Sequence, residues 1–194
     1  MSHISITTIN EEHDTLGAML NSVRMMIQRG PAHQPELFFD IMRAMLFYID
    51  EVPEKQHHPK ETDVLFPLVA KRSPASAELI QRLNKEHHKG EASIRDLQHR
   101  LLAWEILGDA RRPAFEEAAL QYVGFYKEHI HLEESVILPE ALKVLKAEDW
   151  KVVDAAFAVN ADPLSASKPR DPIYDRLFTK ITMKAPAPIG LGSA

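Results

Sequence analysis

The chain has 194 residues, a net charge of −5 and no cysteine. This length suits one domain, with or without an appendage, and the lack of Cys excludes disulfides, iron–sulfur clusters and zinc fingers built on thiolates. The acidic balance and the lack of a basic run argue against a nucleic-acid partner. No apolar run approaches about 18 residues, and no secretory signal leads the chain. We therefore expect a cytoplasmic protein that does not enter a membrane.

The first half of the chain predicts two long helices. Seven glycines are few for this length, and the abundance of Ala, Leu, Glu, Lys and Met favours helix. Apolar residues at three- to four-residue spacing predict a first helix over about 8–30. A second helix over about 35–73 contains Pro53 and Pro59, and proline removes a backbone donor from a helix. We therefore expect the second helix to kink or break at these prolines.

The second half of the chain continues the helical pattern. A third helix is predicted over about 75–107 and a fourth over about 113–146. Shorter helices are predicted within 147–159 and over 173–181, separated by a Pro- and Ser-rich stretch. Four long helices with short connections make an antiparallel up-down four-helix bundle the simplest all-α architecture.

The bundle and the C-terminal part form two units in this interpretation. We assign residues 1–147 to a metal-binding four-helix bundle. Residues 148–194 form a C-terminal helix and a Pro-rich, extended tail, which we expect to pack on the bundle as an appendage.

A weak internal repeat links two of the predicted helices. HHPKETDVLFP (57–67) and HIHLEESVILP (129–139) both read His, three residues, Glu, five residues, Pro. One helix upstream of each copy lies a single histidine, His13 or His87. The chain thus reads as two helical hairpins, each with one His followed by a His-x3-Glu pair.

The titratable residues of these hairpins are predicted to converge. His and Glu at i and i+4 share one helical face, and the third helix repeats this spacing with His87 and Glu91. At about 1.5 Å per residue, the histidines of each hairpin are level to within about 7 Å. Seven side chains should therefore meet in one layer of the bundle: His13, His57, Glu61, His87, Glu91, His129 and Glu133.

Such a layer predicts a metal site, because unneutralised carboxylates in an apolar layer are strongly destabilising. Seven ligands are too many for one tetrahedral zinc and suit two carboxylate-bridged ions, with iron or manganese preferred. Glu61 and Glu133 are the natural bridges, because the repeat relates them. The alternates are the histidines next to the proposed ligands: His58, His88 and His131. The repeat favours His57 over His58, although Pro59 makes this the weakest of the assignments.

These residues resemble the hemerythrin-like, or HHE cation-binding, family over about residues 9–145. The resemblance implies the four-helix hemerythrin bundle and a non-haem centre of two iron ions joined by an oxo or hydroxo bridge, with manganese or zinc as substitutes. His13 would match the lone ligand of the first helix, His57 and Glu61 the pair of the second, and His87 the first ligand of the third. His129 and Glu133 would match the last His and the last bridging carboxylate.

Two departures from the family pattern bear on function. Oxygen-carrying members have a second His in the third helix, where this chain has Glu91, and they end with His-x4-Asp, where this chain has His-x3-Glu. An anionic ligand in place of imidazole should stabilise the ferric state and weaken reversible oxygen carriage.

We therefore expect a di-iron protein that reacts with or senses O₂, peroxide or NO, at an open position facing an apolar pocket. The alternative is a non-enzymatic module for iron binding, storage or interaction. A homodimer, and enzymatic activity as such, are left open.

Overall fold

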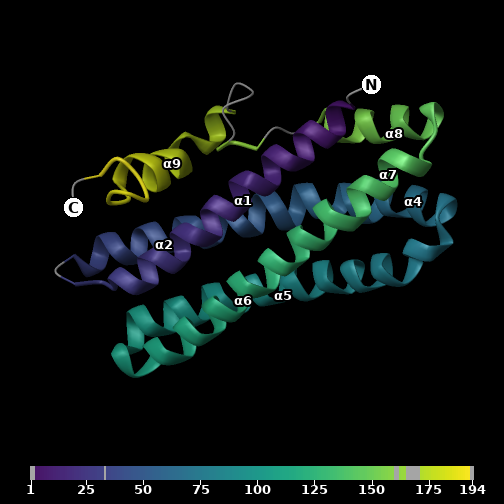
Figure 1. Ribbon diagram of the computed structural model, residues 1–194. Helices are drawn as coiled ribbons and strands as arrows, with labels where there is room; N and C mark the ends of the chain where they lie inside the picture. Colours follow the sequence, from purple (N-terminus) through teal and green to yellow (C-terminus); the bar gives the residue numbers. More distant parts are fainter. Residues whose placement is uncertain (1–2, 33, 160–161, 165–170, 193–194) are drawn as a thin grey trace.

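The computed structural model describes residues 3–32, 34–159, 162–164 and 171–192, and these residues are helical with no strand among them. The helices lie side by side in an elongated bundle (Figure 1). This confirms the prediction of an all-helical fold. The first and third long segments are single helices, α1 (Ile4–Arg29) and α5 (Ala77–Leu107). The second and fourth are interrupted by π-helical turns: α2 (Pro35–Ile49), η1 (Asp50–His57), α3 (His58–Lys60), η2 (Glu61–Leu65) and α4 (Phe66–Arg72), then α6 (Arg112–Leu132), η5 (Glu133–Ile137) and α7 (Leu138–Val144).

Short connections reverse the chain between these segments. Gly30 ends α1 and Gly108 ends α5, and both have positive φ, at 66° and 88°. A residue without Cβ adopts this left-handed conformation without strain, which makes Gly the usual residue after a helix end. A single 3₁₀ turn, η3 (Pro74–Ser76), forms the connection before α5, and a second, η4 (Asp109–Arg111), follows Gly108 in the connection after it.

The second segment, where we expected a kink or a break, is distorted and not broken at its prolines, because π-helical turns interrupt its α-helix there. Pro53 lies inside the π-helical turn η1, and Pro59 lies in α3. Pro67 and Pro139 directly follow the first residues of α4 and α7, just after η2 and η5. A proline ring collides with the carbonyl four residues earlier in a regular α-helix, and a π turn widens the helix locally. The two copies of the repeat share this sequence of a π turn followed by a proline.

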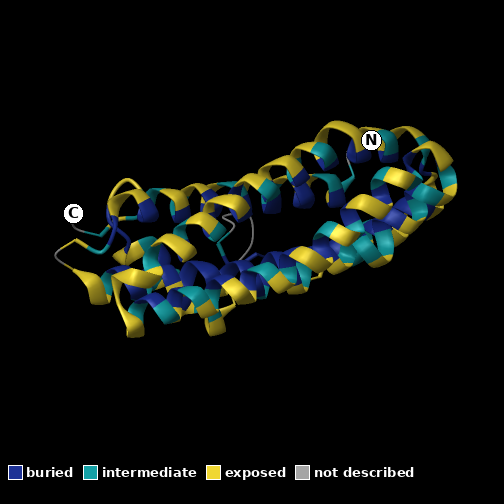
Figure 2. Cartoon of the chain, turned by 90° about the horizontal axis from the view of Figure 1, so that it is seen from below, coloured by how far each residue is buried: buried dark blue, intermediate teal, exposed yellow. Residues whose placement is uncertain are grey.

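The inward sides of the helices carry the buried residues (Figure 2). One apolar cluster fills the end of the bundle near the Gly30 and Gly108 reversals and includes Met42, Trp104 and Phe115. A second cluster fills the opposite end. Along each long segment, a buried polar layer separates the two clusters. The candidate site is therefore enclosed by apolar packing on both sides.

The C-terminal part of the chain packs along the bundle. Helix α8 (Ala147–Phe157) contacts α1, and η6 (Pro172–Tyr174), α9 (Asp175–Phe178) and η7 (Thr179–Lys184) follow, with η7 against α2. The predicted helices over 147–159 and 173–181 are thus present, whereas residues 165–170 of the Pro- and Ser-rich stretch lie outside the described residues. Leu177, Ile181 and Ala185 are buried in the first apolar cluster, and the Tyr48 hydroxyl donates to Asp162 at 2.5 Å.

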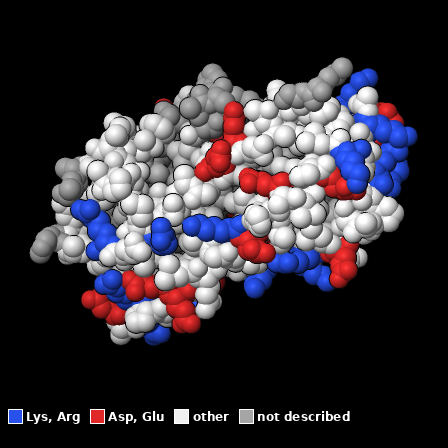
Figure 3. All heavy atoms as spheres, in the orientation of Figure 1, with Lys and Arg blue, Asp and Glu red and all other residues white. Residues whose placement is uncertain are grey.

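The surface carries both signs of charge. On the face shown in Figure 3, acidic and basic side chains are interspersed over most of the bundle, with a basic grouping at one end. Among the described residues, the helices lack the run of apolar residues that would be needed to cross a membrane.

Candidate metal centre

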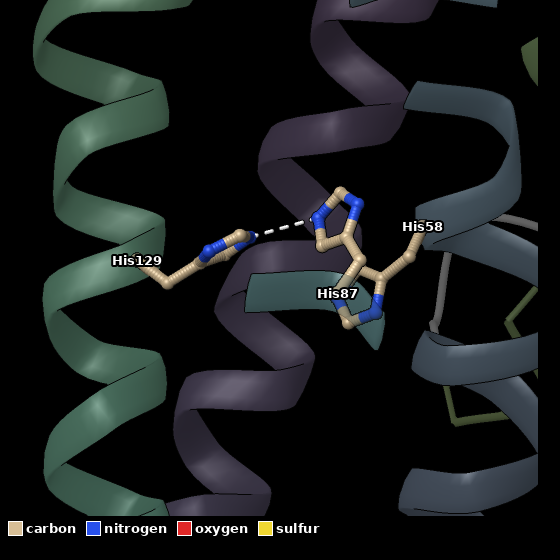
Figure 4. Close-up of side chains that lie close together, drawn as sticks. All are labelled: His58, His87 and His129. Atoms are coloured by element: carbon tan, nitrogen blue, oxygen red, sulfur yellow. Dashed lines mark hydrogen bonds between the residues drawn. The ribbon is translucent and has the colours of Figure 1, made fainter. Parts of the chain in front are cut away.

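Five imidazoles converge in the polar layer from four helical segments. Their Nε2 atoms face one another: those of His13 and His57 lie 3.1 Å apart, and those of His87 and His129 lie 2.9 Å apart. The fifth imidazole belongs to His58. The closely spaced donor atoms include one group with His13, His57 and Glu61 and a second with His58, His87 and His129, and a third group of Glu61, His87 and Glu133 links them. Figure 4 shows the second group, in which three helices present one imidazole each.

Two buried carboxylates span the two groups. One oxygen of Glu61 faces His13 at 3.8 Å, and the other lies 3.3 Å from His57 and 3.6 Å from His87. Glu133 makes the complementary span, with one oxygen 3.3 Å from His13 and the other 3.1 Å from His129. Glu133 therefore offers one oxygen to each group, and one oxygen of Glu61 lies between the two groups, within reach of both His57 and His87.

Each imidazole is held from behind through its Nδ1 atom. The Nδ1 of His57 lies 2.6 Å from Glu12 and that of His129 lies 2.9 Å from Glu86. The remaining three Nδ1 atoms lie 2.8–3.1 Å from their partners, which pair as His13 with Glu134, His58 with Glu54 and His87 with Thr62. Ionised carboxylates only accept hydrogen bonds, so their imidazole partners carry hydrogen on Nδ1. The Nε2 atoms therefore point into the layer, which is the orientation that metal-binding histidines require.

The layer sets imidazoles against two buried carboxylates, and this combination of donors fits metal ions. All four carboxylate oxygens of Glu61 and Glu133 are buried without a hydrogen-bond partner, and a buried unpaired carboxylate is costly. The facing Nε2 atoms of His13 and His57 are two acceptors at 3.1 Å, which only a proton or a cation between them can reconcile. Five imidazoles and two carboxylates around two positions match the donor preference of divalent transition metals.

Comparison with known protein families agrees with this geometry. The model of the hemerythrin HHE cation-binding domain matches residues 5–141, most of the chain. The chain belongs to this family. No curated protein matches it. The family confirms the resemblance read from the two His-x3-Glu copies and shows that this domain binds cations. The matched region ends before α8 (Ala147–Phe157), so the C-terminal part lies outside the HHE domain.

The electrostatics of the HHE site follow from burial and from the two central carboxylates. Burial opposes charge on His57 and His129, but Glu61 facing the first and Glu133 facing the second outweigh it and raise the pKa of each imidazole to about 10. Burial and the neighbouring imidazoles hold the pKa of His58 well below its ordinary value. Protons on His57 and His129 therefore supply the positive charge that bound metal ions would otherwise bring to Glu61 and Glu133.

The structure brings both His57 and His58 into the HHE site, whereas the sequence pattern favoured only His57. Both are 3 % exposed. The i, i+3, i+4, i+7 pattern of a buried helical face is followed by Glu54, His57, His58 and Glu61. Both histidines therefore lie on the same buried face of the segment. That spacing, with a carboxylate one turn before His58, could have predicted His58 as a ligand from the sequence. Comparison of the two copies of the repeat argued against it, because Ile130 occupies the corresponding position in the second copy.

The structure does not bring Glu91 into the cluster. Its side chain is 44 % exposed and pairs with Arg95, because Gly90, and not Glu91, faces the interior one turn after His87. The fifth imidazole of His58 replaces the carboxylate expected from the third helix. In the described residues, the candidate donors that face one another are therefore five imidazoles and two carboxylates, and Glu91 is not among them.

Behind His58 lies a buried network that the sequence reading treated as core. Tyr122 and Tyr126 both donate to one oxygen of Glu54, at 2.7 and 2.6 Å, while its other oxygen holds His58. Burial raises the pKa of Glu54, and the two phenols lower it only in part. Gly90 makes room for this network, since a Cβ there would lie 1.8 Å from the Tyr126 hydroxyl oxygen.

Two different surroundings close the site. On the His58 side, a pocket of about 180 Å³ reaches the imidazoles from the surface. The residues that line it are mostly polar: Glu54, His58, Pro59, Thr62, Asp63, His87, His88 and Glu91. The apolar pocket that we expected beside the site is therefore replaced by a polar one. On the His57 side, the C-terminal part covers the site, with the Phe157 ring 6.0 Å from that of His57 and Val159 accepting a hydrogen bond from Lys60.

Proposed function

We propose that the site binds two metal ions, that both are iron, and that the centre reacts with or senses O₂, hydrogen peroxide or NO. The four long helical segments would then form the antiparallel up-down bundle of the hemerythrin fold, with residues 1–147 as the bundle and 148–194 as its appendage. The observation that carries the proposal is the pair of central carboxylates, Glu61 and Glu133, whose four buried oxygens face imidazoles and make no hydrogen bond.

The protein's own residues would divide the work between them. His13 and His57 would hold one ion and His58, His87 and His129 the other, with Glu61 and Glu133 shared. Iron in such a donor set supplies one-electron redox chemistry and affinity for small oxygen and nitrogen ligands. Carboxylates behind the imidazoles fix their tautomers and orientation.

Access supports a small ligand. The pocket beside His58 and His87 has room for a few water-sized molecules, at about 180 Å³. Apolar clusters pack the bundle on both sides of the layer. A diatomic molecule or peroxide fits such a route, whereas a larger organic substrate does not.

The test is metal analysis and optical spectroscopy of protein produced in iron-replete cells. We expect about two iron ions per chain and near-ultraviolet bands that change on addition of O₂, peroxide or NO. One ion or none would contradict the two-ion site. Two ions with a spectrum that responds to none of these ligands would instead indicate a non-enzymatic module for iron binding or storage.

A further inference from the structure

Two tyrosines are buried against the candidate metal centre. Tyr126 is 0 % and Tyr122 5 % exposed, and their ring centroids lie 4.8 Å apart. Their hydroxyls donate to the same oxygen of Glu54. A phenol that has a carboxylate at 2.6 Å has an acceptor for its proton within reach. The loss of an electron from such a phenol can therefore be accompanied by loss of its proton.

The ring of Tyr126 touches two of the candidate ligands. It stacks on His58, with centroids 5.4 Å apart and planes 3° from parallel. It also meets the His129 ring edge-on, at 5.5 Å. An electron leaving Tyr126 therefore passes through van der Waals contacts alone to reach the imidazoles of the three-histidine group.

The network exists in only one half of the internal repeat. By the spacing of the repeat, Glu54 corresponds to Tyr126 and His58 to Ile130. Gly90, three residues after His87, corresponds to Leu16, three residues after His13. Both halves support an imidazole with a carboxylate from the preceding helix, Glu12 or Glu86. A candidate ligand can therefore be held in place by a carboxylate without any tyrosine. The presence of the tyrosine pair beside Glu54 indicates an additional role for it.

We propose that Tyr122 and Tyr126 are a redox-active pair that hydrogen peroxide oxidises at this centre, with Glu54 as their proton acceptor. The proposal rests on the proposed function, because it needs the loaded centre to react with peroxide. The two phenols are oxidised one after the other: each O–H bond breaks, its proton passes to Glu54 and from there to peroxide before the second follows, and its electron goes to peroxide. The O–O bond of peroxide breaks, so two tyrosines and one hydrogen peroxide become two phenoxyl radicals and two water molecules.

Two pockets near the tyrosine pair suit the transfer of protons and electrons from the tyrosines towards peroxide. Glu54 lines the pocket that reaches His58 and His87, so the protons that it receives can pass to peroxide bound there. Tyr122 lines a separate surface pocket of about 200 Å³ together with Lys89, Arg100 and Phe125. A small reductant in that pocket would meet the outer tyrosine and restore the phenol.

The experiment is electron paramagnetic resonance of iron-loaded protein frozen after addition of hydrogen peroxide. We expect an organic radical whose line shape changes when ring-deuterated tyrosine is incorporated. Tyr126→Phe should abolish most of the signal, and the Tyr122→Phe, Tyr126→Phe double variant all of it. Tyr174→Phe is the matched control: Tyr174 lies in the C-terminal part, accepts a hydrogen bond from Gln56, and should leave the signal unchanged.

Two further measurements separate the possible failures. Phe keeps the ring packing, and equal iron content and helical circular dichroism would verify that the variants fold. In wild-type protein, mass spectrometry should find oxidation products at Tyr122 or Tyr126 but not at Tyr174. If peroxide is consumed equally by wild type and double variant, with no radical and no such products, the relay is wrong and the proposed function stands. If wild type with two irons does not react with peroxide, both proposals lose peroxide as their substrate.

Discussion

His58 supplies the third imidazole of one group, so its loss should affect one metal position more than the other. We expect His58→Gln to weaken iron binding at that position and to lower the iron that survives dialysis, because its three imidazoles and two shared carboxylates become two imidazoles and two shared carboxylates. Metal analysis after dialysis measures this. His88→Gln is the matched control, since His88 is the exposed neighbour of His87 and bonds only to the Asn84 carbonyl in the described structure. Unchanged stoichiometry in His58→Gln would remove His58 from the ligand set.

Glu91 should be dispensable for metal binding. Its carboxylate is half exposed and pairs with Arg95, and an exposed i,i+4 pair of this kind contributes little, about 0.3–0.5 kcal/mol. We expect Glu91→Ala to keep the iron content and the optical spectrum of the wild type. A lost ion or a shifted spectrum would mean that Glu91 turns inward when metal is bound.

Metal binding should release protons from the site. The carboxylates facing His57 and His129 raise the pKa of both imidazoles to about 10, so both are protonated at pH 8 before metal arrives. Metal needs the neutral imidazole and therefore displaces at least these two protons, so affinity should rise with pH until about 10. Calorimetric titration with Zn²⁺ at pH 8, in buffers of different ionisation enthalpy, counts the protons. Binding without proton release would show that the imidazoles were already neutral.

At the scale of one helix, Gly90 decides whether α5 can approach the tyrosine pair. Replacing Gly by Ala inside a helix usually stabilises it by about 0.5–1 kcal/mol. At Gly90 the added Cβ would lie 1.8 Å from the Tyr126 oxygen and 2.9 Å from Glu54. We therefore expect Gly90→Ala to be destabilising by about 1–3 kcal/mol, measured by denaturant unfolding.

Two other helical glycines provide the control for that experiment. A Cβ at Gly17 in α1 or at Gly124 in α6 would meet nothing within 4 Å. Gly17→Ala and Gly124→Ala should therefore leave stability unchanged or raise it by up to about 1 kcal/mol. If Gly90→Ala behaves like these two, the packing of the tyrosines against α5 is looser than the structure indicates.

For the whole molecule, metal should hold the bundle together. Metal binds the folded arrangement and not the unfolded chain, so it adds stability that grows with affinity and free ion. Apo protein should therefore melt below holo protein. The gap should shrink in a Glu61→Gln, Glu133→Gln double variant, because it buries less charge without metal and binds metal more weakly. Glu128→Gln, at an exposed position of α6, is the control.

Melting temperatures by circular dichroism, with metal content verified in each sample, decide this prediction. Equal values for wild-type apo and holo protein would mean that the layer is satisfied without metal. The protons on His57 and His129 would then be sufficient to balance Glu61 and Glu133.

The sequence by itself determined the helical fold and most of the candidate site. Apolar periodicity and few glycines specify long helices because helix formation is local and cooperative. The repeated His-x3-Glu spacing identified six residues that the structure brings into or beside one polar layer: His13, His57, Glu61, His87, His129 and Glu133. Spacing along one helix sets which side chains share a face, so these residues could be found without knowing how the helices pack.

Tertiary structure decided what lies between helices. The choice of His58 over Glu91 depends on how each helix is rotated about its axis, which π turns and a close approach at Gly90 set. The carboxylates behind the imidazoles come from other helices, as Glu12 does for His57 across 45 residues of chain. Such pairings depend on which faces of two helices pack together. The sequence pattern of one helix does not show how the neighbouring helix is rotated about its axis. The place of His58 in the site and the contacts of the tyrosine pair were therefore decided only when the four segments packed together.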